Sequence, residues 1–256
     1  MQIEWLWILL CLTALLAGFT DAVVGGGGLI QLPVLFLVFP AWLPVNIIAT
    51  GRLAGACGTF VAAFQYVKKV QVKWPWLLAT MVAAMLMALV GAFAMKQTPP
   101  QTFKPLVFIV LVVMALYTFA KKQWGFAHHP STVSKPVLWA GLIGMIIGFY
   151  NGYMGPGTGS LLVFAYISIL KHDFLHASAS AKVINFFTDL STIIYFIFID
   201  AIAYKIAIPM AICNVAGGYL GSHLAIAKGS AFVRVFFMIL MIVLILRFGY
   251  EIFIVR

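Results

Sequence analysis

Four ionisable side chains lie inside long apolar stretches of this chain: Asp21, Arg52, Lys182 and Asp189. If such stretches cross a lipid bilayer, each charge at a helix centre opposes insertion by about 2.5 to 3.5 kcal/mol, so each needs a physical reason. Two fixed cations suit a small oxyanion, and an aspartate at the same depth can exchange a proton. The plainer alternative, which stays open, is that the aspartates only neutralise the cations as buried pairs.

Hydrogen-bond donors accompany these charges. Ser178, Lys182, Asn185 and Asp189 are spaced by four, three and four residues, which puts them on one face of a helix. The hydroxyl and amide groups that we take as candidate contacts for an anion are those of Thr50, Thr158, Ser180, Asn151 and Asn185.

The composition places these residues in a membrane. Of the 256 residues, 64% are hydrophobic and 9% are charged, whereas soluble domains are about half apolar and about a quarter charged. We therefore predict an all-α integral membrane protein, with residues 1–256 forming a single membrane domain. The net charge of +10 lies mostly in short loops, such as those with Lys68, Lys69 and Lys73 and with Lys121, Lys122, His128 and His129. This pattern is typical of cytoplasmic loops, so we expect no nucleic-acid partner.

Long apolar runs predict about eight transmembrane helices, near residues 5–23, 45–66, 75–95, 103–120, 137–154, 177–199, 205–225 and 232–250. Two further stretches, 29–39 and 160–170, are too short to cross a hydrocarbon layer of about 30 Å. We expect each of them to be a half-helix. Both follow glycine-rich breaks, at which backbone N–H groups could contact an anion; the candidates are Gly26, Gly27 and Gly157 with Thr158.

The two glycine breaks begin at residues 25 and 155, which are 130 positions apart. The same shift aligns Asp21 with Asn151 and Arg52 with Lys182. We therefore predict two homologous halves, approximately residues 1–120 and 131–250, and paired broken helices of this kind point to a binding site. Alternatively, the glycines only allow close helix packing, as expected for the pairs 51/55, 144/148 and 217/221.

The sequence leaves the topology open. If the two short stretches only dip into the membrane, each half crosses four times, and the halves run parallel with both termini in the cytoplasm. If they count as crossings, each half crosses five times and the halves are inverted.

Taken together, the motifs resemble the sulfite exporter TauE/SafE family of bacterial membrane proteins. They are Gly18-Phe19-x-Asp21-x-x-x-Gly25-Gly26-Gly27-Gly28, Ala49-Thr50-Gly51-Arg52, Gly148-Phe149-Tyr150-Asn151-Gly152-x-x-Gly155-Pro156-Gly157 and Ala179-x-Ala181-Lys182-x-x-Asn185. The resemblance implies a duplicated helical carrier in the bacterial inner membrane that moves sulfur-containing anions such as sulfite or organosulfonates. One segment departs from the family, because many members have Ala-Thr-Asn-Lys where this chain has Ala49 to Arg52.

The leading hypothesis is a secondary transporter, an exporter or permease, rather than an enzyme. Arg52 and Lys182 would attract the anion, and Asp21 and Asp189 are the candidates for coupling transport to protons or ions. Its partners would be the anionic substrate and the lipid bilayer, with a homo-oligomer left open and no cofactor or metal. The alternatives are a passive anion channel and, from another class, an intramembrane hydrolase that uses Ser160 or the histidines.

Overall fold

The computed structural model describes residues 2–95 and 134–253. Within these ranges the chain forms helices and no strand. The helices are α1 (Gln2–Val24), α2 (Gly27–Val38), α3 (Pro44–Lys69), α4 (Trp74–Met95), α6 (Pro136–Tyr153), α7 (Thr158–Ser168), α8 (Phe174–Phe198) and α9 (Tyr204–Phe253). The span predicted at 103–120 and the basic loop residues 121–129 lie outside the described ranges.

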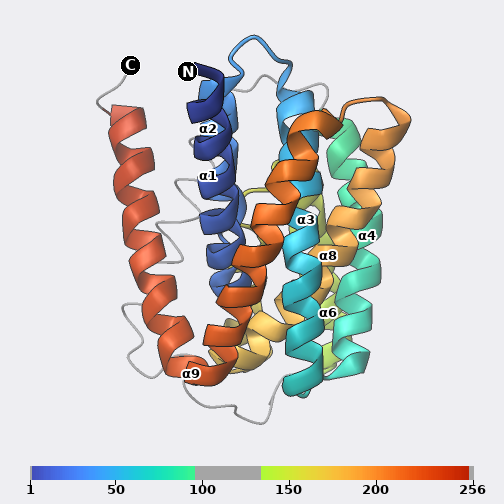
Figure 1. Cartoon of the computed structure of the whole chain (residues 1–256). Helices are drawn as coiled ribbons and strands as arrows, with labels where there is room; N and C mark the ends of the chain where they lie inside the picture. Colours follow the sequence, from blue (N-terminus) through green and yellow to red (C-terminus); the bar gives the residue numbers. More distant parts are fainter. Residues whose placement is uncertain (1, 96–133, 254–256) are drawn as a thin grey trace.

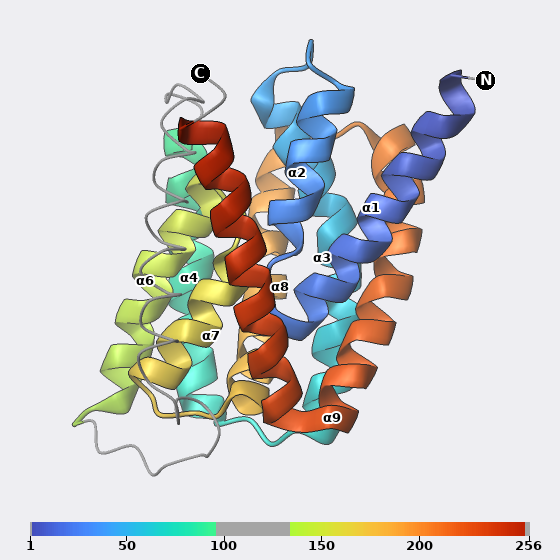
Figure 2. The same cartoon turned by 90° about the vertical axis from the view of Figure 1, so that its left-hand side faces the viewer.

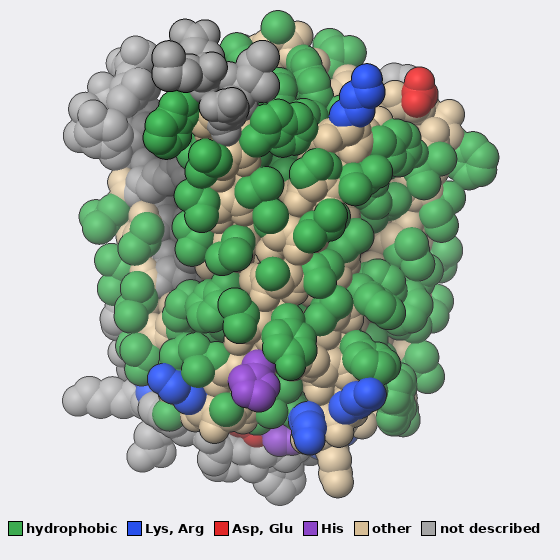
Figure 3. Space-filling model, in the orientation of Figure 1, with side chains coloured by type: hydrophobic (Ala, Val, Ile, Leu, Met, Phe, Trp, Pro, Cys, Tyr) green, Lys and Arg blue, Asp and Glu red, His purple; other side chains and the backbone are tan. Residues whose placement is uncertain are grey.

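The prediction of an all-α membrane protein is confirmed. Six of the described helices are long and apolar enough to cross a membrane, and the predicted short stretches are the 12-residue α2 and the 11-residue α7. The last two predicted spans both fall within α9. A non-helical residue, Gly229 (φ 72°), divides this helix into two parts, and the bend of α9 lies at the lower end of Figure 1. Large apolar side chains are exposed over the middle of the molecule, as expected of a surface that meets lipid (Figure 3).

The helices of the two halves of the chain are interleaved. The most extensive contacts are those of α4 with α6 and of α1 with α9. Glycines allow this close approach, because a Cβ atom on Gly148 would lie 2.4 Å from the Ala84 backbone and one on Gly217 would lie 2.0 Å from the Leu15 carbonyl oxygen. Packing therefore explains the pairs 144/148 and 217/221. Gly55 differs, because no described atom lies within 4 Å of its Cβ position.

Corresponding helices run in opposite directions. Figures 1 and 2 show α3 descending from the upper end to the lower end and α8 rising from the lower end. The helix starts keep the spacing seen in the sequence, since α3 and α8 begin at residues 44 and 174, and α4 and α9 begin at 74 and 204.

The two glycine breaks meet in the interior of the bundle. Gly25 and Gly159 are so close that a Cβ atom on Gly25 would lie 2.3 Å from the Gly159 backbone. The Ser160 N–H donates to the Gly25 carbonyl (3.2 Å) and the Ser160 hydroxyl donates to the Val24 carbonyl (3.0 Å). These bonds satisfy backbone groups that the end of α1 leaves open, and they fix the starts of α2 and α7 next to each other.

Candidate functional site

A pocket of about 70 Å³ lies where the two glycine breaks face α3 and α8. At about 10 to 15 Å³ for each water-sized occupant, it has room for a ligand of roughly five heavy atoms. The predicted site residues that line it are Asp21, Gly27, Arg52, Asn151, Gly157, Thr158, Asn185 and Asp189. They come from both halves of the chain, as the paired breaks predicted.

Lys182 and Asp21 form an ion pair that joins α8 to α1. The Lys182 Nζ lies 3.0 Å from Asp21 Oδ2, and the lysine side chain is completely buried. The same carboxylate oxygen accepts a hydrogen bond from the Thr59 hydroxyl of α3 (2.9 Å). Lys182 itself does not line the pocket and reaches it only through Asp21.

Arg52 of α3 is held by several partners at once. Its Nη1 donates to the Thr192 hydroxyl (2.7 Å) and its Nη2 to the Asn151 carbonyl (2.6 Å), while its Nε lies 3.9 Å from Asp189 Oδ1. The Asn151 amide donates to the same Asp189 oxygen (3.0 Å). A guanidinium has enough directed N–H groups for such a set of partners. The aspartates thus neutralise the cations in two buried ion pairs, Lys182–Asp21 and Arg52–Asp189, as the plainer alternative expects. The carboxylates of both pairs also line the pocket.

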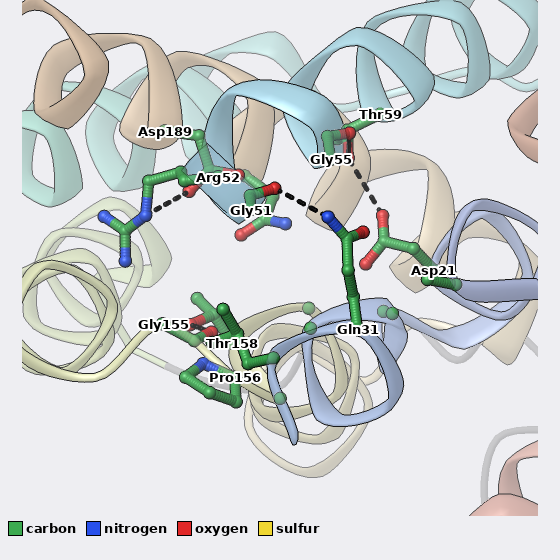
Figure 4. A pocket seen from close by; sticks show the side chains of 18 of the residues that line it. Asp21, Gln31, Gly51, Arg52, Gly55, Thr59, Gly155, Pro156, Thr158 and Asp189 are labelled. Atoms are coloured by element: carbon green, nitrogen blue, oxygen red, sulfur yellow. Dashed lines mark hydrogen bonds and ion pairs between the residues drawn. The ribbon is translucent and has the colours of Figure 1, made fainter. Parts of the chain in front are cut away.

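Figure 4 shows how these groups are distributed. Arg52 and Asp189 lie at one side of the pocket and Asp21 with Thr59 at the other, with Gln31 and Gly51 between them. Gly155, Pro156 and Thr158 form the facing wall. The Arg52–Asp189 pair and the Asp21 carboxylate therefore occupy opposite sides of one space.

Two polar residues of this site were missed by the sequence analysis. Gln31, on α2, donates to the Gly51 carbonyl (3.1 Å), and Asn214, on α9, donates to Gln31 Oε1 (3.3 Å) and the Ala14 carbonyl (3.0 Å). A single glutamine in an otherwise apolar half-helix was the signal that could have identified the first. The buried Oδ1 atoms of Asn185 and Asn214 have no hydrogen-bond partner, so both residues can accept a hydrogen bond from a ligand.

Besides Lys182, three of the predicted site residues do not line the pocket. Thr50 accepts a hydrogen bond from the Ala203 N–H (3.0 Å), and the Ser180 hydroxyl donates to the His176 carbonyl (3.0 Å). Gly26 is also absent from the pocket wall, although it precedes the first residue of α2. The two hydroxyl groups are thus engaged in helix contacts away from the pocket.

The starts of α2 and α7 face the pocket without a side-chain cap. Gly26 and Gly157 occupy the N-cap positions, and no side chain accepts a hydrogen bond from the backbone at either start. The first turn of a helix presents N–H groups and the positive end of the helix dipole. Gly27, Gly28 and Thr158 of these first turns line the pocket, so two helix starts favour negative charge in it.

Comparison with known proteins agrees with this architecture. The chain is similar to a "Probable membrane transporter protein ORF9" of Sinorhizobium sp. (31% identity over 93% of this chain and 90% of the relative). It is also similar to a "Probable membrane transporter protein" of Haemophilus influenzae (26% identity, 97% and 96% of the two chains) and to "Probable membrane transporter protein YfcA" of Escherichia coli K12 (24% identity, 93% and 87%). No solved structure matches the chain.

These relatives match this chain over most of their length and are named as probable membrane transporters. Together with the apolar helices and the charged pocket, they indicate that the protein is a membrane transporter. The family described as Sulfite exporter TauE/SafE matches residues 10–248, nearly the whole chain, and the protein therefore belongs to that family.

Proposed function

We propose that the protein is a secondary transporter of small sulfur-containing anions, such as sulfite or organosulfonates, in the bacterial inner membrane. The observation that carries the proposal is a pair of buried cations on helices of different halves: Arg52 lines the pocket, and Lys182 is paired with Asp21, which lines it. The pocket is small, and two uncapped helix starts add positive potential to it. A compact oxyanion meets these conditions better than a bulky or cationic solute.

We further propose that the two halves are inverted repeats, in which the short helices α2 and α7 count as crossings beside the long helices. The proposal is supported by the shared spacing of 130 between the starts of α3 and α8 and between those of α4 and α9, and by their opposite directions. The sites of secondary transporters built in this way lie between the repeats, at broken helices near the middle of the bilayer. A pocket lined by the glycine breaks of both proposed repeats supports this arrangement.

The basic residues support an orientation. The lower end in Figure 3 includes the α3–α4 connection, the α7–α8 connection and the bend of α9, which carry Lys68, Lys69, Lys73, Lys171 and Lys228. The positive-inside rule places this end in the cytoplasm. The N-terminal end of α1 would then lie on the opposite side.

Counterflow in proteoliposomes tests the proposed function. Vesicles loaded with unlabelled sulfite or methanesulfonate should take up the same labelled anion faster than empty vesicles, because a carrier exchanges its substrate. Arg52→Met and Lys182→Met should lose this uptake, whereas Arg52→Lys, which keeps the charge, should retain it. Lys205→Met, which removes an exposed lysine, is the matched control.

Folding must be separated from transport in this test. Removing Lys182 alone leaves Asp21 buried without its cation, which costs about 3 to 5 kcal/mol. The double variant Asp21→Asn/Lys182→Met removes both charges and should yield folded protein without uptake. Normal uptake by this double variant would refute the proposed role of Lys182, uptake without acceleration by internal anion would indicate a channel, and uptake of neither anion by the wild type would refute the proposed substrates.

A further inference from the structure

We propose that the aspartates of the pocket take up one proton for each negative charge of the substrate anion, which frees the paired cation to bind the anion, so that anion and protons move together without net charge. This inference rests on the proposed function and adds the coupling ion and its stoichiometry.

The first argument is charge balance. Within the described part of the chain, the charged residues that line the pocket are Arg52, Asp21 and Asp189, and with Lys182, the ion-pair partner of Asp21, their formal charges cancel. An anion that entered this neutral interior alone would be a buried charge without compensation, which is strongly unfavourable. A proton bound by Asp21 or Asp189 for each negative charge of the anion would restore neutrality.

The second argument is the order in which an incoming anion meets the charges. The Asp21 and Asp189 side chains are 15% and 13% exposed, whereas those of Lys182 and Arg52 are 0% and 5% exposed. Lys182 therefore lies behind the Asp21 carboxylate, and Arg52 lines the pocket beside the more exposed Asp189 carboxylate. An anion that reached a cation would first be repelled by the carboxylate, unless a proton had neutralised it.

The third argument compares the two sides of the pocket. One side holds an aspartate on α1, a threonine on α3 and a lysine on α8, namely Asp21, Thr59 and Lys182. The residues 130 positions away in the sequence are Asn151, Asp189 and Arg52, and they too are in mutual contact.

The comparison shows that each side has one acid, one cation and one neutral polar residue, but that the acid has changed position. It lies at the end of the first helix in one group and on the third helix in the other. What the two groups share is therefore the balance of charge rather than the position of the carboxylate, as expected if each cation needs one titratable partner.

Other titratable groups near the two acids come from several helices. Asp21 interacts electrostatically with Tyr66 of α3 and with Asp189, besides its ion pair with Lys182. Asp189 interacts with Arg52 of α3, Lys182 of α8 and Asp21 of α1. From α6 and α9, the pocket residues are the neutral Asn151 and Asn214.

The experiment follows protons and anions together. Proteoliposomes containing wild-type protein and an internal pH-sensitive dye receive methanesulfonate from outside, because the anion of a strong acid carries no proton itself. One proton should enter with each methanesulfonate, and a membrane potential imposed with valinomycin and K⁺ should leave uptake unchanged. If sulfite is the only anion transported, the insensitivity to potential decides, because sulfite itself carries protons.

Variants test whether the aspartates carry the protons. Asp21→Asn or Asp189→Asn leaves the pocket with one excess positive charge, so methanesulfonate should enter without a proton. The dye should then report no proton entry, and the rate of uptake should depend on the membrane potential. A charge-balanced test variant is Asn151→Asp/Asp189→Thr, which gives the Arg52 group the arrangement of the Lys182 group; any uptake that it retains should keep one proton for each anion. This double variant keeps the charge balance and remains informative if a single variant fails to fold. The matched control is Lys205→Met, which removes an exposed lysine outside the pocket and should leave transport unchanged.

The possible failures are distinguishable. Uptake of methanesulfonate or sulfite by the wild type with a net current would overturn this inference and leave the proposed function standing. Unchanged proton coupling in both single variants would also overturn it. Uptake of neither anion by the wild type would overturn the proposed function and this inference together.

Discussion

At the scale of single residues, the two cations of the pocket are chemically different. Arg52 distributes its guanidinium over a hydroxyl, a backbone carbonyl and a carboxylate, whereas the Lys182 ammonium is paired with the Asp21 carboxylate. An arginine holds a fixed, planar set of bonds, and a lysine acts as a mobile point charge. A rearrangement of Lys182 during transport therefore breaks fewer bonds than a rearrangement of Arg52.

A third aspartate, Asp173, has a structural role at the lower end. It caps α8 by accepting hydrogen bonds from the His176 N–H (3.0 Å) and the Ser230 hydroxyl (2.8 Å), and its other oxygen contacts the His176 ring (2.6 Å). Burial alone would raise the pKa of Asp173, but these hydrogen bonds together hold that pKa well below its usual range.

This cap predicts a pH-dependent stability. Asp173→Ala should lower the free energy of unfolding by about 0.5 to 2 kcal/mol at pH 7. Because the folded pKa is depressed, the charge contributes fully above the unfolded value of about 3.9, and the contribution is lost as the pH falls through the folded pKa. The melting temperature of detergent-solubilised protein should therefore differ from wild type at pH 7 and differ less below about pH 4.

Asp173→Asn separates the two effects, because asparagine is also a good helix cap. It should remove the pH dependence and retain much of the stability at pH 7. Equal destabilisation by both substitutions at every pH would contradict the role given to the charge.

At the scale of elements, the two broken helices depend on glycine at the point where they touch. Gly25 has a positive φ of 83°, and its Cα faces the Gly159 backbone with no room for a side chain. The break therefore both ends α1 and lets the start of α2 reach the start of α7. Without it, neither the uncapped helix starts nor the pocket between them would form.

Gly25→Ala should consequently prevent correct assembly. The left-handed conformation alone costs an alanine about 1 to 2 kcal/mol, and the added Cβ would lie 2.3 Å from backbone atoms that cannot move aside as a side chain could. We expect a large loss of monodisperse protein in fluorescence-detected gel filtration. Gly141→Ala, whose Cβ would meet no described atom within 4 Å, should behave like wild type, and a normal yield of Gly25→Ala would contradict the described contact.

At the scale of the whole molecule, α3 and α8 run in opposite directions, which supports the inverted halves that we propose. The interleaving of α1 with α9 and of α4 with α6 means that each half packs mainly against the other. A change in the relative position of the halves would therefore act directly on the pocket between them.

Cysteine labelling tests the orientation inferred from the basic residues. In a background lacking Cys11, Cys57 and Cys213, Leu43→Cys in the exposed α2–α3 connection should react with an impermeant maleimide applied to intact spheroplasts. Lys69→Cys, at the opposite end of α3, should react only after permeabilisation. The reverse pattern would show that the positive-inside argument fails for this protein.

The sequence by itself was enough to predict the long helices, the glycine breaks and the charged residues inside the apolar segments. The spans follow from local apolar runs and the breaks from local glycine clusters, so no distant contact is needed to predict either. The same holds for the candidates Arg52, Asn151 and Asp189, which stand out because a polar side chain in an apolar helix is costly.

Only the tertiary structure decided which of these residues meet. Lys182 pairs with Asp21, 161 positions away, and Gln31 joins Asn214, 183 positions away. Thr50 and Ser180, which were themselves predicted to contact the anion, bond elsewhere. The physical reason is that pairing depends on helix direction, rotation and packing between the two halves, which local sequence patterns do not specify.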